Sequence, residues 1–374
     1  MVVMTLDHTR DYVHAAAMAF PPEDLTRTSA AIFMTRWVTH FCAPVFMLLA
    51  GAGAFLRVER GGTPADLSRF LITRGLWLVV LEFTVVRAGF FFDVNGPPFI
   101  LLVFWALGMS MIALSGLVHL PCRALLAVSL AMIVFHNLLD GVAPDRFGSF
   151  GWLWRILHVQ GLLTARPPSI VAYPLVPWIG VMAAGYCFGR VYRLSPERRR
   201  RLLLQLGLAM TAAFLVIRGL NMYGDPRPWS VQGRPLMTVL SFLNTTKYPP
   251  SLSFLLMTLG PSMLFLAWAD RLRLGERNPL VVFGRVPLFY FVLHIPIVHA
   301  FAIALTWLRY GAAPFLFLPP PTLGTPREMF PPDYGWDLWV AYAVTAAAVA
   351  ALYPLCLFFA RLKATRRSWW LSYF

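Results

Sequence analysis

The chain has 374 residues, of which 58% are hydrophobic and only 13% are charged. Soluble domains carry roughly a quarter of charged residues, so this composition excludes a soluble globular protein. The apolar residues come in runs of about 20, the length of a membrane-spanning helix, and not in the short alternating strands of a β-barrel. We therefore expect an all-α, polytopic integral membrane bundle that forms a single domain over residues 1–374.

Ten apolar segments predict about ten transmembrane helices. The first is short and turns polar at Asp7, as expected for a helix whose N-terminal half is missing. The segments are Met1–Ala19, Thr39–Leu56, Phe70–Phe92, Phe99–Val118, Ala124–Leu139, Tyr173–Val191, Leu203–Leu220, Ser251–Ala267, Pro287–Leu308 and Leu338–Phe359.

The loops between these segments alternate in charge. Short, arginine-dense loops follow the second, sixth and eighth segments, and a further basic stretch follows the tenth. Because basic loops stay in the cytoplasm, we place these loops and the C-terminus inside and the longer, proline-rich loops outside. In one outer loop, Gly151–Leu163 could form an interfacial amphipathic helix.

The net charge of +15 is explained by these loops. On a soluble protein it would suggest nucleic acid, but no basic stripe with interleaved aromatic residues lies outside the apolar runs. We expect the lipid bilayer, and no nucleic acid, as a partner. The four cysteines form no CxxC pair, so we expect neither a disulfide nor a metal site.

The richest candidate site lies toward the end of the first segment, in the sequence DHTRDY at Asp7–Tyr12. On a helix, His8 shares a face with Asp11 and Tyr12, whereas Asp7 points elsewhere. A carboxylate beside an imidazole fixes its tautomer and raises its basicity, as a general base requires. The alternative is an interfacial helix end with ordinary salt bridges.

A second candidate site precedes the second segment, where Arg36 and His40 are four residues apart and share a helix face. Together they could clamp an anion or an acyl carbonyl. The alternative is an arginine that snorkels to the interface beside a histidine with a structural role.

Three further ionisable residues are candidate substrate-binding residues. Glu82 lies near the middle of the third segment and must be protonated, paired or exposed to water, so we expect a partner on another helix. His294 lies deep in the ninth segment, where a lone histidine is usually a structural hydrogen bonder. Lys247, in an outer loop, could meet an anionic group or be an ordinary solvated lysine.

Several stretches together resemble a bacterial membrane family similar to heparan-α-glucosaminide N-acetyltransferase. The resemblance extends over nearly the whole chain. The stretches are MTLDHTRDY at Met4–Tyr12, TRWVTHFCAPVFMLLAG at Thr35–Gly51, FLITRGLWLVVLE at Phe70–Glu82, YPLVPWIGVMAAGY at Tyr173–Tyr186, KYPPSLSFLLMTLGP at Lys247–Pro261 and FGRVPLFYFVLHIP at Phe283–Pro296.

This resemblance implies a membrane acyltransferase of the bacterial cytoplasmic membrane. Such an enzyme moves an acetyl group from cytoplasmic acetyl-CoA, a substrate, to an amino or hydroxyl group of a sugar-like acceptor. Membrane acyltransferases carry an arginine upstream of a catalytic histidine; His8 matches the histidine, and the arginine would fall before Met1.

On this reading His8, oriented by Asp11, is the general base, and Arg36 or His40 stabilises the oxyanion. A transporter or exporter of a small metabolite or anion is the alternative function, and a membrane scaffold is a third. A homodimer is left open.

Overall fold

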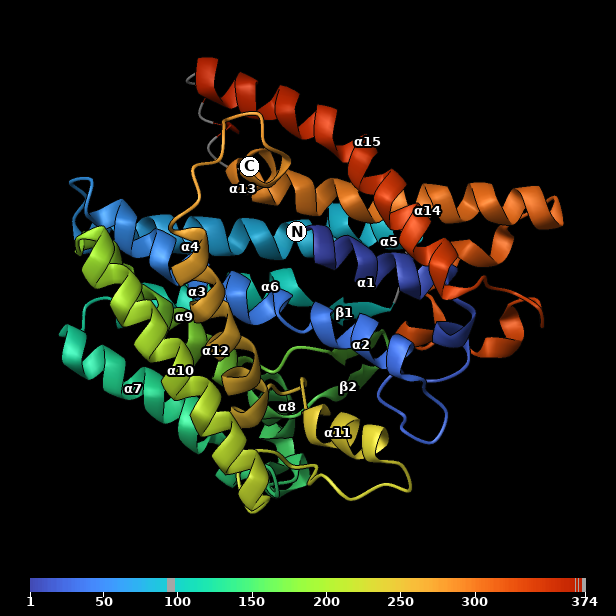
Figure 1. Cartoon of the computed structure of the whole chain (residues 1–374), viewed down its shortest axis with the longest axis horizontal. Helices are drawn as coiled ribbons and strands as arrows, with labels where there is room; N and C mark the ends of the chain where they lie inside the picture. Colours follow the sequence, from blue (N-terminus) through green and yellow to red (C-terminus); the bar gives the residue numbers. More distant parts are fainter. Residues whose placement is uncertain (93–97, 367, 369, 372–374) are drawn as a thin grey trace. The chain divides into compact units, whose positions relative to one another are not determined.

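The computed structural model describes residues 1–92, 98–366, 368 and 370–371, and its regular structure is almost entirely helical (Figure 1). The chain divides into two units. Unit 1 comprises Met1–Cys42, Thr84–Asn95 and Arg273–Phe374, and unit 2 comprises Ala43–Phe83 and Gly96–Leu272.

Six helical segments in the described part of the chain are long and apolar enough to cross a membrane, and the chain is an all-α integral membrane protein. Each of the ten predicted spans contains a helix, but some are short, so the count of ten stays a prediction. The six segments are Ala30–Val58, Cys122–Leu139, Pro196–Leu220, Leu252–Ala269, Pro287–Tyr310 and Leu338–Thr365.

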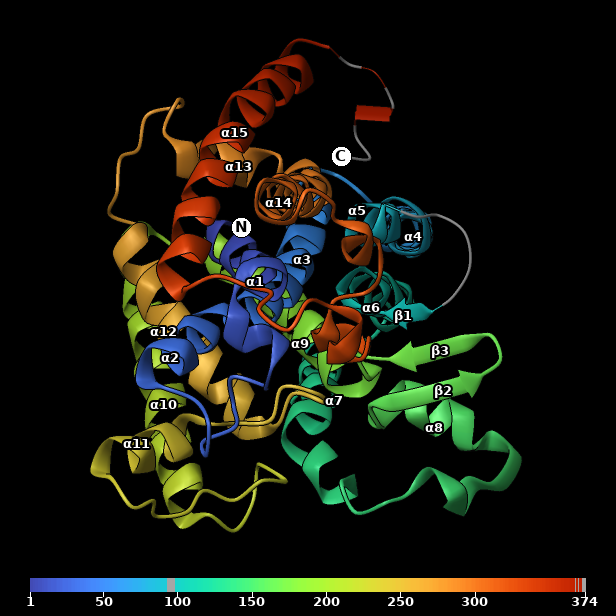
Figure 2. The same ribbon diagram turned by 90° about the vertical axis from the view of Figure 1, so that its right-hand side faces the viewer.

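Unit 1 is built mainly from α1, α14 and α15, which pack against one another (Figure 2). Its elements are α1 (Val2–Val13), η1 (Ala15–Met18), α2 (Ala30–Thr39), α5 (Arg87–Phe91), α13 (Pro279–Arg285), α14 (Pro287–Tyr310), the 3₁₀ turns η6 (Pro314–Phe317), η7 (Pro321–Leu323) and η8 (Arg327–Met329), and α15 (Leu338–Thr365).

The first helix ends at Val13, before the predicted end of its span at Ala19. His14 is extended, and the backbone of this region pairs with Trp336: Ala15 N–H donates to Trp336 O at 3.0 Å. Gly335 has a φ of 112° and lies against Ala15, so a side chain there would be both strained and obstructed. Pairing with a distant strand-like segment therefore stops the helix.

Unit 2 contains three helix pairs that pack closely, α4 with α6, α7 with α9 and α10 with α12. Its elements are α3 (Cys42–Val58, whose first residue closes unit 1), α4 (Pro64–Leu81), β1 (Phe99–Leu101), α6 (Val103–Leu117), α7 (Cys122–Phe135), η3 (His136–Leu139), η4 (Pro144–Phe150), α8 (Gly151–His158), β2 (Gly161–Ala165), β3 (Pro168–Val171), α9 (Leu175–Phe188), η5 (Gly189–Arg193), α10 (Pro196–Leu220), α11 (Pro235–Leu243) and α12 (Leu252–Ala269). The π-helical turn η2 (Glu82–Val86) links α4 to α5.

A small sheet in unit 2 was not expected from the sequence (Figure 2). Its strand order is β1-β3-β2, with β1 parallel and β2 antiparallel to β3. Two predictions were wrong here. The predicted span Phe99–Val118 begins with strand β1, and the predicted interfacial helix Gly151–Leu163 is helical only as α8, because its last residues form β2.

The arginine-dense loops of unit 2 lie at a common end of their helices. Arg193, after α9, forms an ion pair with Glu59, after α3. A second ion pair joins the start of α10 to the end of α12: Arg199 Nη2 lies 2.7 Å from Asp270 Oδ1. The side of the membrane on which these loops lie stays a prediction.

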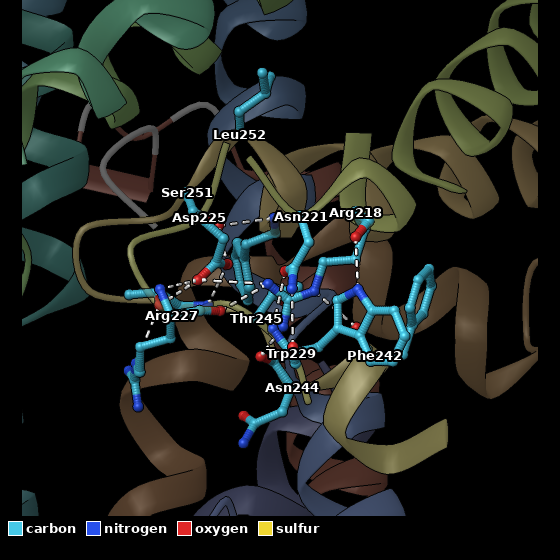
Figure 3. A network of polar contacts seen from close by, with 12 residues as sticks. Arg218, Asn221, Asp225, Arg227, Trp229, Phe242, Asn244, Thr245, Ser251 and Leu252 are labelled. Carbon is cyan, nitrogen blue, oxygen red and sulfur yellow. Dashed lines mark hydrogen bonds and ion pairs between the residues drawn. The ribbon is translucent and has the colours of Figure 1, made fainter. Parts of the chain in front are cut away.

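The loop between α10 and α12 is held by a buried arginine (Figure 3). Arg218, in the last turn of α10, is 2% exposed and donates to backbone carbonyl oxygens that lie far apart in the loop. The acceptors are Arg227 O at 2.8 Å, Phe242 O at 3.0 Å, Ser241 O at 3.2 Å and Asn244 O at 2.8 Å. Arg218 therefore connects the end of α10 to both ends of the loop.

Candidate active site

The last two turns of α1 present a titratable pair that the sequence predicted. His8 Nδ1 lies 3.9 Å from Asp11 Oδ2, at the expected spacing of three residues, and both side chains are partly exposed, at 20% and 17%. Tyr12 is instead buried, and its hydroxyl donates to Phe90 O at 2.6 Å. The pair is therefore formed by His8 and Asp11, without Tyr12.

Two arginines bind the carboxylates of α1, Asp7 and Asp11: Arg10 comes from α1 itself and Arg36 from α2. Arg10 Nη2 donates to Asp11 Oδ1 at 2.8 Å and lies 3.5 Å from Asp7 Oδ1. Arg36 Nη1 donates to both oxygens of Asp7, at 2.6 and 2.7 Å. Arg36, expected as an anion clamp, is thus already engaged by carboxylates of its own chain.

Glu23, in the loop before α2, extends this cluster. It accepts a hydrogen bond from Arg36 Nε at 3.1 Å, and His40 Nε2 lies 3.8 Å from the same oxygen. Burial alone would raise the pKa of Glu23, but the nearby His40 and the charge of Arg36 hold it well below its usual range. Glu23 is therefore ionised at neutral pH. The term charged cluster is used below for Asp7, His8, Arg10, Asp11, Glu23, Arg36 and His40.

A second imidazole lies beside the cluster. The ring of His294, in α14, is centred 5.2 Å from the ring of His8 and is fully buried. Its Nδ1 pairs with Phe291 O, which leaves Nε2 as the unprotonated acceptor of the neutral ring. In the described part of the chain, Nε2 has no hydrogen-bond partner. His294 makes a backbone hydrogen bond, as a structural histidine does, and also lies beside His8, so its role stays a prediction.

The cluster has an unequal charge balance. Its three carboxylates face two guanidiniums, so the sum is one negative charge when the imidazoles are neutral. A nearby negative charge favours the protonated form of an imidazole. The cluster can therefore stabilise one histidine that gains a proton.

Glu82 belongs to unit 2, and its carboxylate binds the backbone at the N-terminus of α6. Its Oε2 accepts hydrogen bonds from the backbone N–H groups of Phe104 and Trp105, at 2.8 and 3.1 Å. The N-cap residue of α6, Leu102, provides no side-chain cap of its own. The expected partner on another helix is confirmed, and it is the positive end of a helix dipole.

Lys247 also belongs to unit 2 and is only 8% exposed, so most of its side chain is buried, and its role stays a prediction. Its ammonium lies over the ring of Tyr248, 5.2 Å from the centroid.

Sequence reasoning missed part of the cluster. Asp7 was expected to point away, and nothing marked Arg10 or Glu23 as site residues, because Glu23 reaches Arg36 only through the fold of the loop. Among the described residues no group of three or more His, Cys, Asp or Glu side chains could hold a metal ion. All four cysteines are free thiols, with the sulfurs of Cys122 and Cys187 3.7 Å apart.

The chain is a polytopic membrane protein that places a partly exposed histidine among paired carboxylates. Such a group of ionisable side chains is typical of an enzyme active site. A family model described as "Heparan-alpha-glucosaminide N-acetyltransferase, catalytic" matches residues 14–223, more than half of the chain. The chain belongs to this family. The matched region includes Glu23, Arg36 and His40 and begins after His8. No curated protein and no solved structure matches the sequence.

Proposed function

We propose that this protein moves an acetyl group from cytoplasmic acetyl-CoA to an amino or hydroxyl group of a sugar-like acceptor. It does so in the bacterial cytoplasmic membrane, with its C-terminus in the cytoplasm. Family membership supports the acetyltransferase class. The observation that carries the mechanism is the arrangement of His8 between Asp11 and His294 inside a cluster with one surplus negative charge.

His8 is the general base of this proposal. Asp11 lies on the Nδ1 side of the ring and favours the tautomer with a proton on Nδ1, which leaves Nε2 to accept a proton. Histidine is the side chain most often used as a general base in enzymes. When the ring becomes an imidazolium, the surplus charge of the cluster stabilises it.

The reaction needs no further reagent. His8 takes the proton from the acceptor N–H or O–H as that atom attacks the thioester carbonyl carbon. The tetrahedral intermediate then collapses, the C–S bond breaks, and the sulfur leaves with the proton returned by His8. The products are an amide or ester and free coenzyme A.

The other predicted site residues take supporting roles in this proposal. Arg36 and Glu23 hold Asp7 and His40 in place, and His40 stabilises the oxyanion. His294 offers its buried Nε2 to a hydroxyl or amine of the acceptor. Glu82 stabilises the start of α6, a positioning role.

The test uses purified full-length protein in nanodiscs, acetyl-CoA and a panel of amino sugars and neutral sugars. Release of coenzyme A and acetylated product are both measured. We expect wild-type turnover and a loss of at least about 100-fold in His8→Ala, the usual contribution of a general base. We expect His294→Gln to raise KM for the acceptor more than it lowers kcat.

His119→Ala is the matched control, because His119 is an exposed histidine of unit 2 that contacts Ser68. It should keep wild-type turnover. Equal turnover by wild type and His8→Ala would reject the role of His8. A transporter, the alternative function, would consume no acetyl-CoA with any acceptor.

A further inference from the structure

Two cysteine side chains meet where α7 begins and α9 ends. Cys122 is the first residue of α7, and Cys187 is the last but one of α9. Their sulfurs lie 3.7 Å apart, and Cys187 Sγ also lies 3.8 Å from the main-chain oxygen of Cys122. The two residues are 65 positions apart in the sequence, so this contact depends on the packing of the two helices.

The packing of α7 against α9 keeps the two sulfurs close together. At the other end of the contact, a Cβ atom on Gly180 would lie 2.9 Å from Met132 Cβ and 3.1 Å from Ser129 O. The start of α7 therefore meets the end of α9, and residues further along α7 meet the first half of α9. The helices run antiparallel with little space between them, which fixes the pair of sulfurs at one end.

A disulfide between these sulfurs needs only a small movement. The S–S bond length is about 2 Å, so the sulfurs must approach by about 1.7 Å from their present separation. A change of side-chain rotamer moves a cysteine sulfur further than this. The backbones of the two helices can therefore stay packed while the bond forms.

The surroundings of the pair favour oxidation. Both cysteines are half-buried, so a small oxidant can reach them, whereas Cys356 is fully buried. Cys122 lies at the N-terminus of α7, which has no side-chain cap and attracts negative charge. Arg123 and Arg190 flank the two cysteines in the sequence. A thiolate beside a helix N-terminus and basic residues, with a second thiol in contact, is the usual arrangement of a redox-sensitive cysteine pair.

We propose that Cys122 and Cys187 form a reversible oxidation site, at which a peroxide converts the two thiols into a disulfide that joins α7 to α9. The Cys122 thiolate attacks one peroxide oxygen, the O–O bond breaks, and a sulfenic acid and one water form. The Cys187 sulfur then attacks the sulfenic sulfur, the S–O bond breaks, and the departing hydroxyl takes the thiol proton as a second water. Two thiols are oxidised and one peroxide is reduced.

The predicted topology places this end of the helices in the cytoplasm, where thiols are kept reduced. The resting state is therefore the dithiol, and the disulfide forms only while an oxidant is present. A dithiol reductant reverses it by thiol–disulfide exchange. The site shares no residue with the charged cluster and stands whether or not acetyl transfer is demonstrated.

The experiment uses the full chain in nanodiscs, treated with a small molar excess of hydrogen peroxide. The reaction is stopped with acid, free thiols are alkylated, and the peptides are identified by mass spectrometry. In wild type we expect the thiols of Cys122 and Cys187 to be lost together and a peptide pair joined by these two residues to appear. Dithiothreitol should return both thiols to the alkylated form.

Cys122→Ser and Cys187→Ser should each abolish the joined peptide pair, and Cys122→Ala and Cys187→Ala replace them if the serine variants do not fold. Cys42→Ser is the matched control, since it removes another half-buried thiol and leaves the pair intact. It should form the joined peptides as wild type does. The proposal is overturned if wild type yields no joined pair, or if either cysteine ends as an acid that dithiothreitol does not reduce.

Discussion

Glu23 illustrates how a loop carboxylate is kept ionised by partners that are distant in sequence. Arg36 and His40 come from α2 and its C-cap, and Glu23 from the preceding loop. Its side chain is 25% exposed, so solvent screens the pair only partly. Its ionisation therefore contributes to the stability of unit 1.

This contribution depends on pH with a definite sign. The folded-state pKa of Glu23 lies below the usual value of 4.5, so the stabilisation is present above pH 4.5 and is lost as the pH falls through the folded-state pKa. At pH 7 we expect Glu23→Gln to lower the free energy of unfolding by about 1–3 kcal/mol. The difference from wild type should shrink at pH 3, measured by thermal unfolding in detergent.

Glu328→Gln is the control for this experiment, since Glu328 is exposed in a different loop of unit 1. It should follow wild type at both pH values. A Glu23→Gln difference that is the same at pH 7 and pH 3 would contradict the ionised pair.

At the scale of elements, α3 and α9 approach each other through glycine. A Cβ atom on Gly51 would overlap the backbone of Met182 and Tyr186, and one on Gly185 would overlap the backbone of Leu48. Small residues allow such close approach of membrane helices. Backbone atoms cannot move aside as a flexible side chain can.

We therefore expect Gly51→Ala to destabilise the protein by about 1–3 kcal/mol, or more if the helices separate. Gly53→Ala, two residues further along the same helix, is the matched variant because nothing lies within 4 Å of its added Cβ. It should be neutral or slightly stabilising, since alanine favours helix over glycine by up to about 1 kcal/mol. Thermal unfolding of both variants side by side decides; equal losses would refute the packing argument.

The sequence predicted most helices because apolar runs reveal them directly. Pro287 opens α14 and Leu338 opens α15, both at the predicted starts. The sequence could not predict where an element begins or ends when that boundary depends on contact with residues far along the chain. The end of α1 at Val13 depends on Trp336, and strand β1 depends on its pairing with β3.

The same limit applies to the candidate site. The spacing of His8 and Asp11 on one helix predicted their proximity, because local geometry fixes it. The contacts of His294 with His8 and of Glu82 with the start of α6 depend on how helices pack, and no local pattern encodes that. Their assignment as site residues stays a prediction.

For the whole molecule, the charge of the loops predicts which ends of the helices face the cytoplasm. Arginine-dense loops of unit 2 are joined by the Arg193–Glu59 and Arg199–Asp270 pairs, and the positive-inside rule places them in the cytoplasm. A fluorescent protein fused to the C-terminus should therefore fluoresce. Alkaline phosphatase inserted into the loop 311–337 should be active, and the same insertion after Glu59 should be inactive. The reverse pattern would overturn the orientation.

Arg218 has a consequence for how the loop between α10 and α12 can vary. Its guanidinium is bound by main-chain oxygens, which every amino acid possesses, so these four contacts do not depend on the side chains of Arg227, Ser241, Phe242 and Asn244. A substitution at one of those four positions can therefore change the surface of the loop and leave its bond to Arg218 in place. Asp225 differs in this respect, because its own carboxylate binds Thr246 and Ser251.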